Sequence, residues 1–169
     1  LAGRTAFHAM LVGAVVGVVA CGFFALLQLA DHALLEGVAG YRQLRPSGEH
    51  GFDLGLARAH LVLPILVVLP ALGGLVAGLL AHRVAHETAG GGGDAYIDGF
   101  HRRGGLVRKR VAWVKMLATA FTLGTGGSAG REGPTMQVGA AIASLVSRTF
   151  DVSPRERRIL MVAGTAAGL

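Results

Sequence analysis

The sequence predicts an all-α, polytopic integral membrane protein. Of its 169 residues, 52% are hydrophobic and only 15% are charged, with a mean hydropathy of +0.55. Soluble domains carry about 25% charged residues. The chain also contains uncharged apolar runs long enough to cross a bilayer, which takes about 20 helical residues. Glycine, at 27 residues, suits closely packed membrane helices because it lets two backbones approach each other.

Two long apolar runs predict membrane spans. The first expected span covers residues 5–39 and has no charged residue before Asp31. The second covers residues 57–86, and its apolar part contains Pro64 and Pro70. Membrane helices tolerate such prolines as kinks. The polar stretch between the spans is expected to be a loop. Glycines four apart, Gly13 with Gly17 and Gly74 with Gly78, are typical of helix-packing faces.

The second half of the chain predicts shorter helices. Asp94 is a good N-cap residue for a helix at about 95–103. Ser153 and Pro154 predict the start of a last helix at about 155–169, because proline favours the first helical position.

A glycine-rich stretch, residues 124–133, separates two further apolar segments. These segments, at about 111–123 and 134–148, are each too short to cross a bilayer. They predict a discontinuous membrane helix, whose irregular backbone must be buried in protein or line a polar cavity. Transporters place substrate sites at such breaks.

The basic residues predict how the chain is oriented. Residues 82–110 contain six Lys and Arg, whereas residues 40–58 contain three. By the positive-inside rule the 82–110 loop is cytoplasmic, and the N-terminus then lies on the same side. This explains the formal charge of +6 better than a nucleic-acid partner does. The chain starts at Leu1 and ends within an apolar run, so we expect a fragment of a longer protein.

The best-marked site in the sequence is Gly130-Arg131-Glu132-Gly133-Pro134. Pro134 predicts that a helix begins near Gly133, with free N–H groups and a partly positive end. Gly130 and Gly133 have no side chains to block a ligand. These features predict an anion site built from backbone amides, which suits a halide.

Glu132 lies at the same helix end, within a membrane-embedded stretch. A carboxylate there is a functional-site hypothesis in itself. It could occupy the anion site as a tethered anion and leave it when protonated, which would link anion access to proton concentration. The alternative is that Glu132 only caps the helix and pairs with Arg131.

The motif and the following Thr-Met-Gln-Val-Gly-Ala-Ala-Ile closely resemble the central motif of the CLC family of chloride channels and chloride/proton exchangers. The resemblance implies that Glu132 is the gating glutamate and that the backbone amides of Gly130, Arg131 and Gly133 face chloride. An earlier run, Gly91-Gly92-Gly93-Asp94-Ala95, occupies the place of a second family motif. There Gly92 replaces a chloride-coordinating serine, so Gly92 and Gly93 offer backbone amides only.

The resemblance covers the whole chain, as roughly the first third of the family's membrane domain. It implies transport of chloride or a similar small anion, as a channel or a chloride/proton antiporter. It also implies a homodimer with one pore per subunit, and an inverted repeat of which this chain holds most of one half. We expect a plasma-membrane protein with no cofactor.

Two other classes of function remain open from the residues. One is a non-transporting structural or sensor subunit in which Glu132 is only a helix cap. The other is an intramembrane metalloenzyme that uses His82 and His86, although their spacing is not that of zinc proteases. The sequence has no Ser/His/Asp or Cys/His arrangement in catalytic order, and its single Cys21 excludes an internal disulfide. We therefore expect neither an enzyme nor a bound metal.

Overall fold

The computed structural model describes residues 2–41 and 62–169, and every regular element in these ranges is a helix. The all-α prediction is thus confirmed. Most of the predicted loop between the spans lies outside the described residues. In chain order the helices are α1 (Ala2–Asp31), the π-helix η1 (His32–Ala39), α2 (Leu63–Arg83), the 3₁₀ turn η2 (His86–Thr88), α3 (Gly93–His101), α4 (Lys109–Gly124), α5 (Glu132–Thr149) and α6 (Pro154–Ala167).

Two segments are long and apolar enough to cross a membrane. They are Gly3–Ala39, formed by α1 and η1, and Leu63–Arg83, which is α2. Only 17% and 11% of their most apolar windows are buried, whereas a core helix of a soluble protein would be mostly buried. Their apolar side chains face outward, as expected for helices in contact with lipid. Pro64 lies in the first turn of α2, so only Pro70 is inside the helix.

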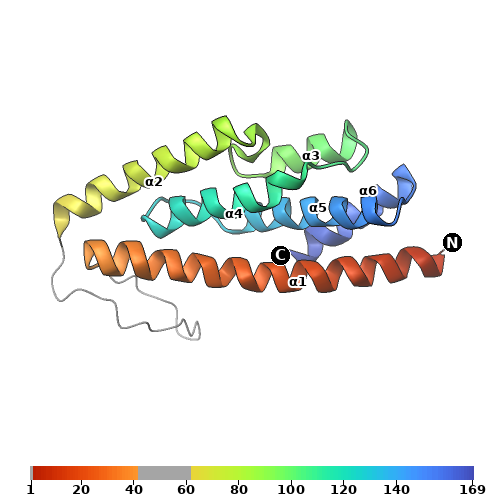
Figure 1. Cartoon of the computed structure of the whole chain (residues 1–169), viewed down its shortest axis with the longest axis horizontal. Coiled ribbons are helices and arrows are strands. Elements are labelled where there is room, and N and C mark those ends of the chain that lie inside the picture. Colours follow the sequence, from red (N-terminus) through yellow and green to blue (C-terminus); the bar gives the residue numbers. More distant parts are fainter. Residues whose placement is uncertain (1, 42–61) are drawn as a thin grey trace.

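The two short helices beside the glycine-rich stretch are present as α4 and α5, but they do not form one interrupted helix. The chain reverses after Gly124, and α5 returns alongside α4 (Figure 1). At the turn, the Gly127 N–H donates to the Thr122 carbonyl at 2.8 Å. At the far end, the Val107 N–H donates to the Ser144 hydroxyl at 2.9 Å. The pair is an antiparallel hairpin, which corrects the prediction of a discontinuous helix.

Helix α6 begins where the sequence predicts and anchors the start of α1. The Ser153 hydroxyl caps it by accepting the Glu156 N–H at 3.3 Å. The buried Glu156 carboxylate accepts hydrogen bonds from Arg4 and Thr5, each at 3.2 Å, and lies 3.0 Å from Nδ1 of the buried His8. Three residues of the first turns of α1 therefore converge on one carboxylate of α6.

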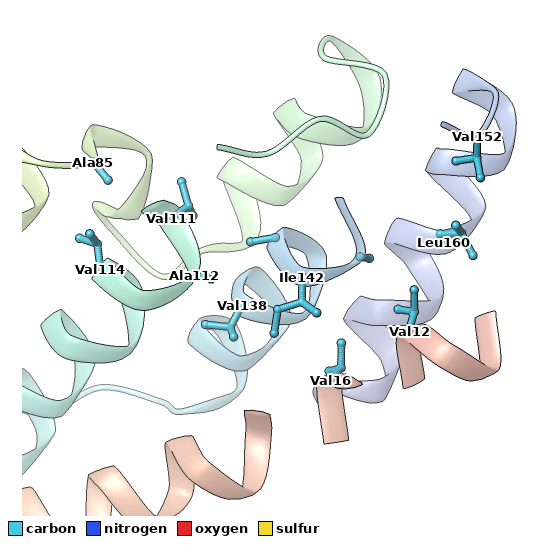
Figure 2. Close-up of a cluster of buried hydrophobic side chains, with 12 residues drawn as sticks. Val12, Val16, Ala85, Val111, Ala112, Val114, Val138, Ile142, Val152 and Leu160 are labelled. Carbon is cyan, nitrogen blue, oxygen red and sulfur yellow. The ribbon is translucent and has the colours of Figure 1, made fainter. Parts of the chain in front are cut away.

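The buried core joins α1, α4, α5 and α6 through small and medium-sized side chains. Figure 2 shows valines of α1 meeting side chains of α5 and α6, with α4 packed on the other side of α5. Backbones come into contact where glycines face each other: a Cβ placed on Gly139 of α5 would lie 2.2 Å from the Gly164 carbonyl oxygen of α6. Any side chain at Gly139 would force these helices apart.

The glycine pairs expected to pack helices do not do so within the described residues. A Cβ placed on any of them would meet nothing within 4 Å (Gly13, Gly17, Gly74 and Gly78). Spacing of four places two glycines on one face but does not say what that face contacts, so packing at these pairs stays a prediction.

Candidate anion-binding site

The N-terminus of α5 has the free donors that the sequence predicts. The helix begins at Glu132, with Arg131 as N-cap, and no described side chain caps it. Pro134 in the first turn has no N–H to satisfy. The first N–H bonded into the helix is that of Thr135, which donates to the Arg131 carbonyl at 3.1 Å. The N–H groups of Glu132 and Gly133, at the positive end of the helix dipole, can therefore face a ligand.

A second helix N-terminus meets this one. Helix α3 begins at Gly93 with Gly92 as N-cap, and again no side chain from the described residues caps it. A Cβ placed on Gly133 would lie 2.1 Å from the Gly91 carbonyl oxygen, and one placed on Gly92 would lie 2.7 Å from the Gly133 carbonyl oxygen. The structure thus brings the two glycine-rich segments of the sequence into backbone contact, with Gly130 and Arg131 leading into the same junction.

Gly92 adopts a backbone conformation that serine would rarely take. Its φ is +100°, in the left-handed region that favours glycine. A side chain at this position would also collide with the Gly133 carbonyl. In this conformation the junction has room for backbone donors but not for a serine hydroxyl.

Glu132 is exposed at the junction, and its carboxylate is folded back toward the preceding glycine. Its Oε2 lies 2.7 Å from the position of a Cβ on Gly130. The alternative pairing with Arg131 is not observed: among the ion pairs of the described residues none involves Glu132. The Arg131 guanidinium instead lies 5.2 Å from the centre of the Phe24 ring of α1.

Lys115 of α4 is the buried cation next to the junction, with 3% of its surface exposed. Its ammonium donates to the Thr88 carbonyl at 3.0 Å and to the Gly90 carbonyl at 2.6 Å. It lines a cavity of about 470 Å³ together with Gly90, Gly91 and Gly130. This cavity offers space beside an ammonium group, and Gly130 is the one predicted anion-binding residue that lines it.

Glu87 lies just before the first glycine-rich segment, in the 3₁₀ turn η2. Its carboxylate accepts hydrogen bonds from Arg108 and Arg103, and Arg103 also donates to Asp98 at 2.7 Å. The hydrogen bonds from Arg108 lower the pKa of the Glu87 carboxyl, partly opposed by its burial. On its inner side, the Glu87 carbonyl accepts from the side-chain amide of Gln137 at 2.6 Å. Gln137 was not predicted as a site residue, although its place four residues after Gly133 puts it on the same helix face.

The histidines do not form a metal centre in the part of the chain that the structure describes. No group of three or more His, Cys, Asp or Glu side chains there could hold a metal ion. The rings of His82 and His86 lie 6.2 Å apart, centre to centre. Another histidine, His101, lies in the last turn of α3, where its ring contacts that of Phe100.

Comparison with known proteins identifies the family to which this arrangement belongs. A family model described as voltage gated chloride channel matches residues 73–169, which include both glycine-rich segments and Glu132. The chain belongs to this family. The match confirms the resemblance stated from the motifs, although the family model covers only this part of the chain.

Individual members of the family show similar agreement. Chloride channel protein CLC-e of Arabidopsis thaliana is 37% identical over 105 residues, which is 62% of this chain and 14% of that protein. The H(+)/Cl(-) exchange transporter ClcA of Klebsiella pneumoniae is 40% identical over 112 residues, 65% of this chain and 24% of the relative. A putative chloride channel protein, ClcB-like, of Ralstonia nicotianae is 30% identical over 125 residues, 70% and 29% respectively.

The chain therefore spans between 14% and 29% of the length of these relatives. No solved structure matches the chain significantly.

Proposed function

We propose that the protein containing this chain carries chloride, or a similar small anion, across a membrane, and that Glu132 gates the path. The observation that carries the proposal is the contact between the two helix N-termini at Gly92 and Gly133. We expect the uncapped backbone amides of both helix ends to face one region, with Glu132 attached to one of them. Amides held by the fold can replace the water around a halide without a change of structure on binding.

The expected ligands of the anion are backbone N–H groups of Gly130, Arg131, Gly133, Gly92 and Gly93. Glu132 competes with the anion as a carboxylate and releases the site when it is protonated or swings away. Relatives named as a chloride channel and as a H(+)/Cl(-) exchanger both support anion transport. The proposal accordingly includes both a channel and a proton-coupled exchanger, and an enzyme activity is not part of it.

The proposed orientation places the N-terminus and residues 82–110 in the cytoplasm of a cell whose plasma membrane holds the protein. The N-terminus, α3 and the start of α6 lie at one end of the bundle (Figure 1), and basic residues gather there. The positive-inside rule assigns such an end to the cytoplasm. On the basis of the family resemblance we also propose that the protein is a homodimer, that chloride is the transported ion and that transport needs no cofactor.

The test is anion flux from proteoliposomes that contain the complete natural polypeptide, with external pH recorded at the same time. Chloride efflux with proton counter-movement, in which Glu132→Ala abolishes proton movement and retains chloride movement, is the result expected of an exchanger. Chloride efflux without proton movement, altered by the same substitution, is the result expected of a channel. Asp151→Asn, which removes an exposed carboxylate at the far end of α5, is the matched control. No anion flux in the wild type would leave Glu132 as a structural cap and refute the proposal.

A further inference from the structure

Side chains of α4 and α5 donate hydrogen bonds to backbone carbonyl groups in residues 87–90, the segment that leads into α3. The Glu87 carbonyl accepts from Gln137 of α5, and the Thr88 and Gly90 carbonyls accept from Lys115 of α4. In a planar peptide the carbonyl and the following N–H point in opposite directions. Holding the Gly90 carbonyl therefore fixes the direction of the Gly91 N–H, whereas the N–H groups of Thr88 and Ala89 donate to the Ala85 and His86 carbonyls.

Gln137 also touches the junction between the two helix N-termini. A Cβ placed on Gly92 would lie 3.1 Å from Oε1 and 3.2 Å from Cβ of Gln137. Gln137 lies one turn beyond Gly133 on α5. One side chain thus contacts the N-cap of α3, belongs to the first turns of α5, and donates to the loop that precedes α3.

The orientation of the Gln137 amide is fixed, and it leaves one atom unsatisfied. Only 2% of the residue is exposed, and its Oε1 has no hydrogen-bond partner among the described residues. Rotating the amide by half a turn would place Oε1 against the Glu87 carbonyl, so that two acceptors would face each other. A buried acceptor without a partner costs free energy. A methionine of similar length would remove this cost but would also leave the Glu87 carbonyl without its donor.

Gln137 lines one of two cavities beside the glycine-rich segments. It lines a cavity of about 670 Å³ with Asp94 and Asp98, whereas the cavity beside Lys115 lies on the side of Gly90 and Gly130. The cavity of about 670 Å³ also contains Arg103 and Arg108, and Gln137 does not line the cavity beside Lys115.

We propose that Gln137 is a positioning residue of the anion site. It holds the N-terminus of α3 against that of α5, so that the two sets of amides converge on one anion. The inference rests on the proposed function and adds a residue to it. Without the Gln137 donor, the Glu87 carbonyl is released and the loop shifts against α5. Displacing binding groups by a fraction of an ångström weakens the contacts with the anion more than it affects the folding of the helices.

The experiment compares three variants of the complete polypeptide, using chloride alone as the ligand. Gln137→Met removes the donor and keeps the volume. Gln137→Glu replaces the donor by a carboxyl that can donate only when protonated. Gln28→Met makes the same chemical change in another helix, α1, and is the matched control. The measurements are chloride binding by calorimetry in detergent, the chloride dependence of flux, and the melting temperature.

Gln137→Met should raise the half-saturating chloride concentration by about tenfold, equivalent to ~1.4 kcal/mol, while maximal flux and melting temperature stay near those of the wild type. Gln28→Met should leave the half-saturating concentration unchanged. Gln137→Glu should bind chloride more weakly than the wild type at alkaline pH and about as tightly as the wild type at acid pH. Variant and wild type are compared at the same pH. This rescue keeps the proposal testable if Gln137→Met does not fold.

Two failures have different meanings. Suppose that the wild-type protein transports chloride but Gln137→Met has the wild-type half-saturating chloride concentration. The positioning role is then wrong and the proposed function stands. The same conclusion follows if the half-saturating chloride concentration of Gln137→Glu, divided by that of the wild type, does not change with pH. If the wild type neither binds nor moves chloride, the proposed function itself is wrong.

Discussion

Replacing Gly133 with alanine perturbs the contact between α3 and α5 by a known amount. The added Cβ would lie 2.1 Å from the Gly91 carbonyl oxygen, and real Cβ contacts are essentially never shorter than 3.0 Å. The two backbones must therefore separate by about 0.9 Å, because Cβ is fixed by the backbone and the Gly91 oxygen belongs to the main chain, so that no flexible side chain can rotate away. Strain of this kind typically costs about 1–3 kcal/mol.

Most of this displacement falls on the two sets of amides that define the proposed anion site. We expect Gly133→Ala to weaken chloride binding by at least about tenfold, since a shift near 1 Å can cost about 100-fold in a site that depends on geometry. The assay is chloride binding by calorimetry, followed by efflux from proteoliposomes over a range of chloride concentrations.

Gly74→Ala provides the control for the same chemical change. Gly74 also lies in a membrane helix, but a Cβ placed there meets nothing within 4 Å in the described part of the chain. Its chloride affinity should equal that of the wild type. If Gly133→Ala folds and binds chloride as tightly as Gly74→Ala does, the two helix N-termini do not form a common site, and the reasoning fails.

Two predictions concern the stability of the end of the bundle that contains Glu87 and Glu156. Because the folded-state pKa of Glu87 is lowered, its stabilising contribution is present above the ordinary carboxyl pKa and is lost as pH falls through the lowered value. Melting temperatures measured between about pH 7 and pH 3 should fall more steeply for the wild type than for Glu87→Gln, and parallel curves would contradict this. Glu156→Ala should lower the melting temperature because Arg4, Thr5 and His8 lose their common acceptor. Glu156→Gln keeps an acceptor oxygen and should lower it less; equal values for both variants would refute the role of the carboxylate.

Local sequence features predicted most of the helices. Apolar runs marked α1 and α2, and Ser153 with Pro154 marked the start of α6, because caps and first-turn prolines act within one turn of chain. The lengths of α4 and α5 followed from the glycine-rich stretch between them. The reversal of direction in that stretch did not follow, since a run of glycines permits a straight break and a tight turn equally.

The contacts that assemble the candidate site are long-range, and this is why the sequence left them open. Both glycine-rich segments were predicted as anion-binding, but nothing in their spacing shows that Gly92 touches Gly133, 41 positions later. Lys115 and Gln137 likewise act on carbonyl groups at least 25 residues away. The roles of Glu132 and of the backbone amides stay predictions until flux and binding are measured.

The α4–α5 hairpin also constrains how the protein enters the membrane during synthesis. At 1.5 Å per residue, α4 with 16 residues and α5 with 18 extend about 24 Å and 27 Å, less than the ~30 Å hydrocarbon core. Neither can be released into lipid alone as a stable span, and α4 carries the charge of Lys115. The carbonyl groups that accept from Lys115, those of Thr88 and Gly90, precede it in the chain. They are therefore made before it, so the earlier loop can shelter the charge as the hairpin is inserted as a unit.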